Sequence, residues 1–257
     1  NLTQLGKFMS SANRETRLEA AKLYYGFLKD NDEKIGNIYD QLVHLRTNMA
    51  LKLGFKSYTE LAYLRLTRLD YTPEMVEEYR KQIYEYVVPQ VAKLMKEQSI
   101  RINIKNPLFV DYNLKFLSGN PVPKGNINDL VSAASKMYHE MSKETGEFFD
   151  YLVDNHYMDL EAKKGKMGGG YMTYLPKYKT PFIFANSNGT SSDVDTLTHE
   201  FGHAFQGYLG SKILVPDLRM PTLESCEIDS MSMEFFAWPW MNLFFGEDAD
   251  KYKFMHL

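Results

Sequence analysis

The sequence predicts a mainly helical protein with one small β-sheet. Most of the chain shows apolar residues at helical spacing, interrupted by cap residues, prolines and glycines. Two short runs, KMGGGYMTYL and TPFIFANSNG, are instead rich in aromatic and β-branched residues and have the composition of strands. With 257 residues, the chain is long enough to bury a sizeable core as one large domain or as two lobes.

Four helical segments are predicted in the first hundred residues, each with apolar side chains at helical spacing: 13–31, 32–54, 57–66 and 72–98. Ser57 and Glu60 have the spacing of a capping box at the start of the third segment. Thr72 is the expected cap of the fourth, and Pro73 occupies its first helical position. Pro89 lies inside this last segment, so we expect a kink there or the end of its first part.

The second half of the chain alternates between connectors, helices and the two strands. Residues 106–125 are rich in Pro and Gly and indicate an irregular connector. Asn128 is the expected cap of a helix that runs to about Thr145. A helix over 191–210, with serine at its cap, should follow the strands, and a last helix should begin behind Pro221.

Composition excludes several classes of protein. The net charge is −3 and both signs are mixed along the chain, which gives no support for binding nucleic acid or a membrane surface. The sequence contains no run of about 18 apolar residues, so no transmembrane helix is predicted. The single cysteine, Cys226, excludes an internal disulfide framework and suggests a reducing, cytoplasmic location. We expect Cys226 to be a small buried side chain. The start lacks both an initiator Met and a signal peptide, so we expect an interior piece of a longer polypeptide.

The stretch DTLTHEFGHAFQ carries the strongest functional signal. His199 and His203 are four residues apart, so on a helix they lie on one face and can bind one metal ion. Glu200 can then reach a water molecule at the metal without binding the metal itself. Gly202 leaves room for a neighbouring backbone or for substrate. This H-E-x-x-H pattern predicts metal-dependent hydrolysis; the alternative is three polar residues that happen to lie on a helix.

A catalytic zinc site needs a third protein ligand and an open fourth position. The segment ESCEIDSMSMEFF follows, and it places Glu224, Glu227 and Glu234 on one face of a predicted helix. The neighbouring residues are apolar, and a buried carboxylate needs a metal, a cation or strong hydrogen bonds. The alternative is the solvated edge of an amphipathic helix.

HEFGHAFQ followed by EIDSMSME resembles the thimet oligopeptidase and oligoendopeptidase F group of zinc metallopeptidases. The resemblance is specific over residues 165–236, which include the strand pair and the glycine-rich loop before the metal helix. It implies a helical zincin-type enzyme, with a small sheet beside the metal helix and two lobes around a deep channel. Region 1–125 would then form part of one channel wall and region 126–257 the zinc-binding part. A later segment with transition-state-stabilising His and Tyr residues follows in that family, and this chain ends before it.

The resemblance also implies roles for individual residues. Three residues match the ligands of one Zn²⁺ ion and a fourth matches the general base: His199, His203, Glu227 and Glu200. Glu234 matches a carboxylate that lies behind the ligands and orients them. Asp195 is a further candidate for such a position, as is Glu224.

Short peptides are the implied substrates. The strand at residues 181–187 is expected to pair with an extended peptide by strand addition, and a plain core strand is the alternative. The residues expected to contact the peptide come from the glycine-rich loop and the two strands: Gly168, Gly169, Tyr171, Ala185 and Asn186. Tyr171 and Tyr174 could equally belong to the core.

Two rival functions remain at this point. One is a non-catalytic zincin-like module that binds a metal or a peptide, which would have no use for a base at Glu200. The other is an aminopeptidase, although the chain has no clear Gly-x-Met-Glu-Asn-type segment for binding an amine. The other four histidines lack partners at ligand spacing, and the last is expected at a frayed end: His44, His139, His156 and His256.

Overall fold

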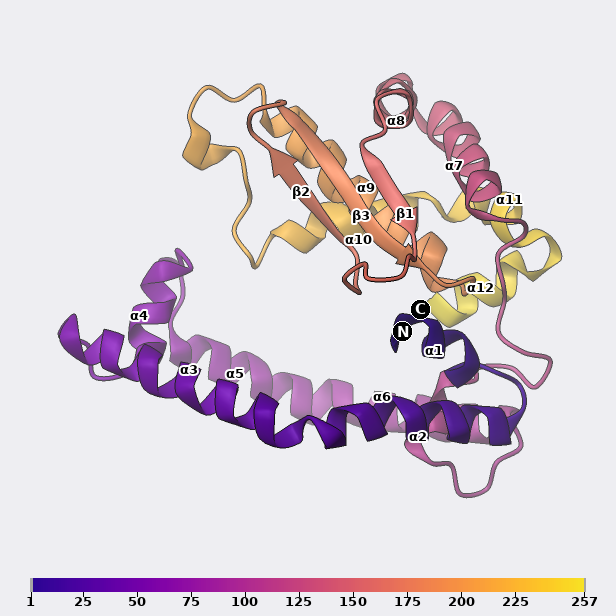
Figure 1. Ribbon diagram of the computed structural model, residues 1–257, viewed down its shortest axis with the longest axis horizontal. Coiled ribbons are helices and arrows are strands. Elements are labelled where there is room, and N and C mark those ends of the chain that lie inside the picture. The colour runs from indigo at the N-terminus through magenta and orange to yellow at the C-terminus, as the bar shows by residue number, and fades with distance from the viewer. Residues whose placement is uncertain (1, 257) are drawn as a thin grey trace. The chain divides into compact units, whose positions relative to one another are not determined.

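The computed structural model describes residues 2–256, which form two compact units (Figure 1). One unit runs from the N-terminal segment to Arg17 and resumes at Leu114; the other is Leu18–Asn113. The chain is mostly helical with a small sheet, which confirms the predicted fold class. The division into regions 1–125 and 126–257 stays a prediction. None of the helices described here combines the length and apolar character needed to cross a bilayer.

The Leu18–Asn113 unit is helical, and its first helix, α2, begins four residues earlier in the other unit. The helices are α2 Arg14–Asp30, α3 Asp32–Lys52, α4 Tyr58–Arg65, α5 Pro73–Gln82 and α6 Val88–Arg101. The predicted caps are present, because Ser57 accepts the amide of Glu60 and Thr72 accepts that of Met75. A π-turn, Ile83–Val87, separates α5 from α6. Pro89 is the second residue of α6 and explains the interruption, since proline has no N–H and its ring excludes a carbonyl one turn earlier.

The second unit contains the sheet and the remaining helices: α1 Leu2–Met9, α7 Ile127–Met141, α8 Lys143–Asp154, β1 Met158–Glu161, β2 Tyr171–Leu175, β3 Thr180–Ser187, α9 Ser192–Gly210, α10 Cys226–Phe236, α11 Met241–Phe245 and α12 Ala249–His256. The prediction of one helix from Asn128 to about Thr145 is wrong. Asn126 is the cap of α7, and the chain breaks at Ser142, whose hydroxyl caps α8 by accepting the amide of Thr145.

The helix predicted behind Pro221 begins later, at Cys226, because a turn anchored on the carbonyl of Thr222 precedes it. Glu224 therefore lies before α10 and is exposed. Cys226 is only partly buried, which corrects the expected buried side chain. Its thiol donates a hydrogen bond to the carbonyl of Leu223.

The sheet has the strand order β1-β3-β2, with β1 parallel and β2 antiparallel to β3. The strand β1 was not predicted, since four residues with two acidic side chains give little strand signal. β3 lies in the middle of the sheet, where its backbone pairs with both neighbours. The expectation that residues 181–187 offer an edge to a peptide is therefore wrong, and β2 is the edge strand on that side.

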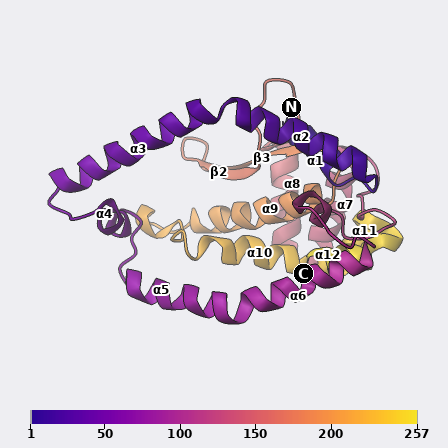
Figure 2. The same ribbon diagram turned by 90° about the horizontal axis from the view of Figure 1, so that it is seen from below.

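Helix α9 packs on the sheet and beside α10 (Figures 1 and 2). Its apolar residues recur at helical spacing and join the main core of this unit: Val194, Leu197, Phe201 and Ala204. Phe201 stacks on Tyr138 of α7 with ring centroids 3.7 Å apart. Because this face is anchored in the core, the opposite face of α9 is held in a fixed direction. His199 and His203 lie on that opposite face.

The two helices α9 and α10 approach each other at Gly202. A Cβ atom at this position would lie 2.7 Å from the carbonyl oxygen of Asp229 and from the Cα of Ser230. These are main-chain atoms, so they cannot move aside as a flexible side chain could. The glycine thus makes room for a neighbouring backbone, one of the two options that its position in the motif suggested.

Gly202→Ala is expected to destabilise the protein by about 1–3 kcal/mol, the usual cost of overpacking. Alanine is the better helix former by about 1 kcal/mol, so propensity alone predicts the opposite sign. Gly207→Ala, on the same helix, is the matched control, because its Cβ would lie no closer than 3.6 Å to any neighbour. Chemical denaturation of both variants gives the comparison. A Gly202→Ala protein as stable as Gly207→Ala would contradict the close backbone approach.

Candidate metal centre

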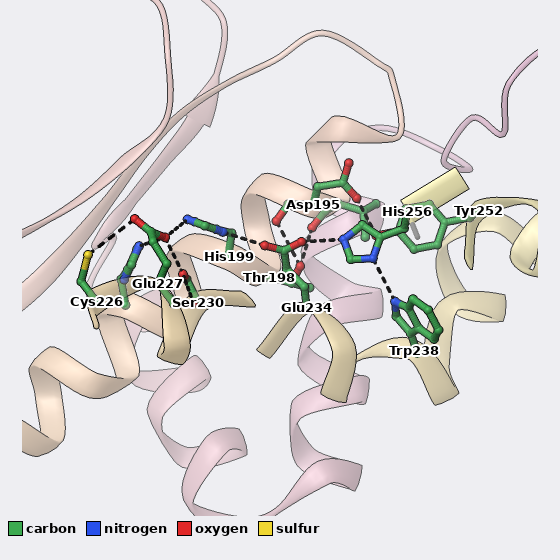
Figure 3. A network of polar contacts seen from close by, with 12 residues as sticks. Asp195, Thr198, His199, Cys226, Glu227, Ser230, Glu234, Trp238, Tyr252 and His256 are labelled. Carbon is green, nitrogen blue, oxygen red and sulfur yellow. Dashed lines mark hydrogen bonds and ion pairs between the residues drawn. The ribbon is translucent and has the colours of Figure 1, made fainter. Parts of the chain in front are cut away.

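Three predicted ligands meet where α9 and α10 lie side by side. The ligand atoms of His199, His203 and Glu227 all lie within 4.8 Å of one another. One oxygen, Oε2 of Glu227, is 3.1 Å from Nε2 of His199 and 3.4 Å from Nε2 of His203. Figure 3 shows the Glu227 carboxylate turned toward His199. Two imidazole nitrogens and one carboxylate oxygen are the donor set of a catalytic zinc site, so these residues fit the ion that the sequence implies.

The protonation states of the ligands also suit a metal. Ser230 donates a hydrogen bond of 2.8 Å to Glu227, and this bond is the main reason that the pKa of Glu227 is lowered. Burial lowers the pKa of His203, and the neighbouring His199 lowers it further. Metal ligands must be deprotonated, and both shifts favour the deprotonated form.

Glu234 lies directly behind His199, in the position that the resemblance implied. Its Oε1 is 2.7 Å from Nδ1 of His199, and its side chain is only 13% exposed. A carboxylate in this place holds the proton on Nδ1 and leaves Nε2 to face the other ligands.

Asp195 lies one turn before His199 on α9, and its carboxylate accepts a hydrogen bond of 2.5 Å from the hydroxyl of Tyr252. This contact is with α12, whereas Glu234 contacts His199 itself. Burial is the largest influence on this group and raises the pKa of Asp195 to about 6, against an ordinary value of 3.8. The hydrogen bond from Tyr252 and the proximity of His256 act in the opposite direction.

The stability of an Asp195→Asn variant, relative to the parent protein, is expected to increase as the pH rises from about 4 to about 7. A carboxyl with a raised pKa favours the folded state below its ordinary pKa of 3.8, and this contribution is lost as the pH rises through about 6. Asparagine keeps an oxygen that can accept from Tyr252 but cannot ionise. Denaturation of both metal-free proteins across this range measures the difference, and a difference independent of pH would refute the expectation.

Glu200 is buried beside the ligand cluster, and its Oε2 has no hydrogen-bond partner among the described residues. Burial raises its pKa, while His199 and the backbone amide of Met172 lower it. A Cβ at Gly170 would come within 2.7 Å of Thr196 and 3.7 Å of Glu200, so the glycine loop passes close over this carboxylate. A buried carboxylate that has a raised pKa and one oxygen without a partner is suited to accept a proton.

The five predicted substrate contacts fall into different places. Gly169, Ala185 and Asn186 line one pocket of about 170 Å³ beside α9. The Asn186 amide donates to the carbonyl of Gly169 and so holds the glycine loop in place. Gly168 is exposed in the same loop. Tyr171 stacks on Phe184 across the sheet and is 40% exposed.

A group of residues at the back of the site was not predicted from the sequence: Trp238, Tyr252 and His256. His256 was expected at a frayed end, but its side chain is 12% exposed and its Nε2 lies 2.5 Å from Oε2 of Glu234. That contact joins residues 22 positions apart on different helices, so no local pattern signals it.

Two histidines and a glutamate are the protein ligands of several zinc peptidases, and here two helices of a mainly helical fold bring them together. The sequence profile of peptidase family M3 matches residues 7–251. The chain belongs to peptidase family M3, which confirms the resemblance to the oligoendopeptidase F group.

Several relatives support this assignment. A Bacillus anthracis str. Ames structure, provisionally described as an oligoendopeptidase F, is 53% identical over 99% of this chain with a TM-score of 0.97. A structure of PZ peptidase A with an inhibitor is 51% identical over 99% of this chain with a TM-score of 0.98. Oligoendopeptidase F of Lactococcus lactis subsp. cremoris is 25% identical over 77% of this chain. The chain spans 32% of that last protein and 47% and 45% of the two solved chains.

Proposed function

We propose that the protein containing this chain is a zinc-dependent endopeptidase that hydrolyses bonds in short peptides. The observation that carries the proposal is the buried carboxylate of Glu200, whose Oε2 has no partner among the described residues, next to the convergent His199, His203 and Glu227. A purely structural metal site has no use for such a group. The non-catalytic metal-binding or peptide-binding module is for this reason the weaker alternative.

Each residue of the site has a part in the proposed reaction. His199, His203 and Glu227 would hold a zinc ion, which would supply Lewis acidity to a water molecule and to the peptide carbonyl. Glu200 accepts a proton from water and passes it to the leaving amine, a transfer that its raised pKa favours. Glu234 keeps His199 in the orientation that points Nε2 toward the cluster.

The relatives and the sheet support the proposed substrate class. Two of the matched proteins are described as oligoendopeptidase F, and the structure of PZ peptidase A contains an inhibitor. The edge strand β2 has backbone groups suited to pair with an extended peptide, as strand addition does in other proteins. A cytoplasmic location is part of the proposal and rests on the single cysteine.

Elemental analysis and a quenched-peptide assay on the same preparation test the proposal. We expect one zinc ion per chain, hydrolysis of short peptides, loss of hydrolysis with a chelator and recovery on adding zinc. A stably folded globular domain serves as the control substrate and should remain intact. Zinc without hydrolysis would instead support the binding module, and absence of both would refute the metal site.

A further inference from the structure

A continuous polar chain runs behind the metal cluster from Trp238 to His199 (Figure 3). The indole Nε1 of Trp238 donates to Nδ1 of His256 over 3.2 Å. Nε2 of His256 lies 2.5 Å from Oε2 of Glu234, and Oε1 of Glu234 lies 2.7 Å from Nδ1 of His199. Trp238 and His256 have no part in the proposed reaction.

The donor and acceptor roles along this polar network follow from the indole N–H of Trp238. An indole N–H can only donate, so Nδ1 of His256 must accept and carries no proton. The ring proton of His256 is then on Nε2 and is donated to Glu234. The second oxygen of Glu234 faces Nδ1 of His199 and accepts the hydrogen bond from the N–H at that nitrogen. Nε2 of His199 is left with a free electron pair directed at Glu227 and His203.

The surroundings of His256 restrict its motion. Tyr252 stacks on its ring with an interplanar angle of 17°, and the rings of Trp238 and Phe235 lie 5.8 Å and 5.3 Å away. The side chains of His256 and Glu234 are only 12% and 13% exposed. Hydrogen bonds are stronger in such an environment than in water, so this network holds one arrangement.

We propose that His256 is a positioning residue, oriented by Trp238, that acts through Glu234 to set the tautomer and direction of the His199 ring. The inference rests on the proposed function in taking His199 as a metal ligand. The alternative is a protonated His256 that serves as a counter-ion for Glu234. That arrangement would point the Nδ1 proton at the indole proton of Trp238, two donors facing each other.

The protonation pattern can be observed without metal or substrate. Nitrogen-15 spectra of the metal-free protein, labelled at histidine, distinguish a protonated ring nitrogen from a bare one. We expect His256 to be protonated only on Nε2 and His199 only on Nδ1. In Trp238→Phe, which removes the indole proton and keeps an aromatic ring, His256 should show a mixture of tautomers. A doubly protonated His256 in the parent protein, or a proton on its Nδ1 alone, would overturn the proposal.

Zinc affinity, measured by competition with a chromophoric chelator, supplies the second readout. His256→Leu should lower the affinity by about 10–100-fold, the usual effect of losing a group that supports a ligand. His256→Gln places an amide N–H near the position of Nε2 and should restore most of the affinity. His139→Leu, which removes a half-exposed histidine paired with Asp150, is the matched control and should change nothing. Thermal unfolding of each metal-free variant shows whether it is folded.

The two readouts separate this inference from the proposed function. A parent protein that binds no zinc would refute the proposed function, while the tautomers of the metal-free protein would still test the role of His256. A zinc-binding parent in which His256→Leu is folded and binds zinc equally well would overturn the role of His256 and leave the proposed function intact.

Discussion

Replacing Glu200 with glutamine is expected to slow peptide hydrolysis by a factor of about 10² or more, the order expected for losing a general base. Glutamine keeps the size and polarity of the side chain but cannot take a proton. Glu200 is not one of the three clustered ligands, so zinc should stay bound. The measurement is kcat on a quenched peptide, with the zinc content determined on the same sample.

Glu224→Gln is the matched control for this experiment. It makes the same chemical change at an exposed glutamate that lies before α10. Its kcat should equal that of the parent protein. Near-normal turnover in a zinc-replete Glu200→Gln protein would rule out the proposed base.

Glu227→Ala is expected to lower zinc affinity by more than the 10–100-fold that is typical of residues behind the ligands. The variant removes one of three donors, and it also leaves Ser230 without the carboxylate that it binds. Glu234→Ala should fall in the 10–100-fold range, because it supports His199 rather than the metal. Chelator competition measures all of these affinities.

Glu224→Ala distinguishes between the candidate glutamates of this segment and should leave zinc affinity unchanged. A loss of zinc in Glu224→Ala with retention in Glu227→Ala would mean that the ligand lies one turn earlier than the motif implies. The position of Glu224 outside α10 makes that outcome unexpected.

Features set by neighbouring residues could be predicted from the sequence. The caps Ser57 and Thr72 and the interruption near Pro89 depend only on residues within one turn, and all three are present. The pair His199 and His203 belongs to the same class, because a spacing of four on a helix places both rings on one face. Family membership extended this local information to Glu227 and Glu234 on a second helix.

Features that depend on tertiary packing could not be predicted. The central place of β3 follows from its pairing with β1, a strand too short to recognise. The break at Ser142 arises because its hydroxyl caps the following helix, a choice that competes with continuing α7. His256 meets Glu234 across two helices, and its place near the end of the printed sequence suggested fraying.

The contact at Gly202 has a consequence for how this region tolerates sequence change. On the α10 side the two nearest atoms are the carbonyl oxygen of Asp229 and the Cα of Ser230, which every amino acid possesses, and the Cβ of Met233 follows at 3.0 Å. The close approach of the two helices therefore depends mainly on the absence of a side chain at position 202 of α9. In a library of all single substitutions, selected for zinc binding, position 202 should accept only glycine. Exposed positions on α10, such as Ile228 and Met231, should accept many residues.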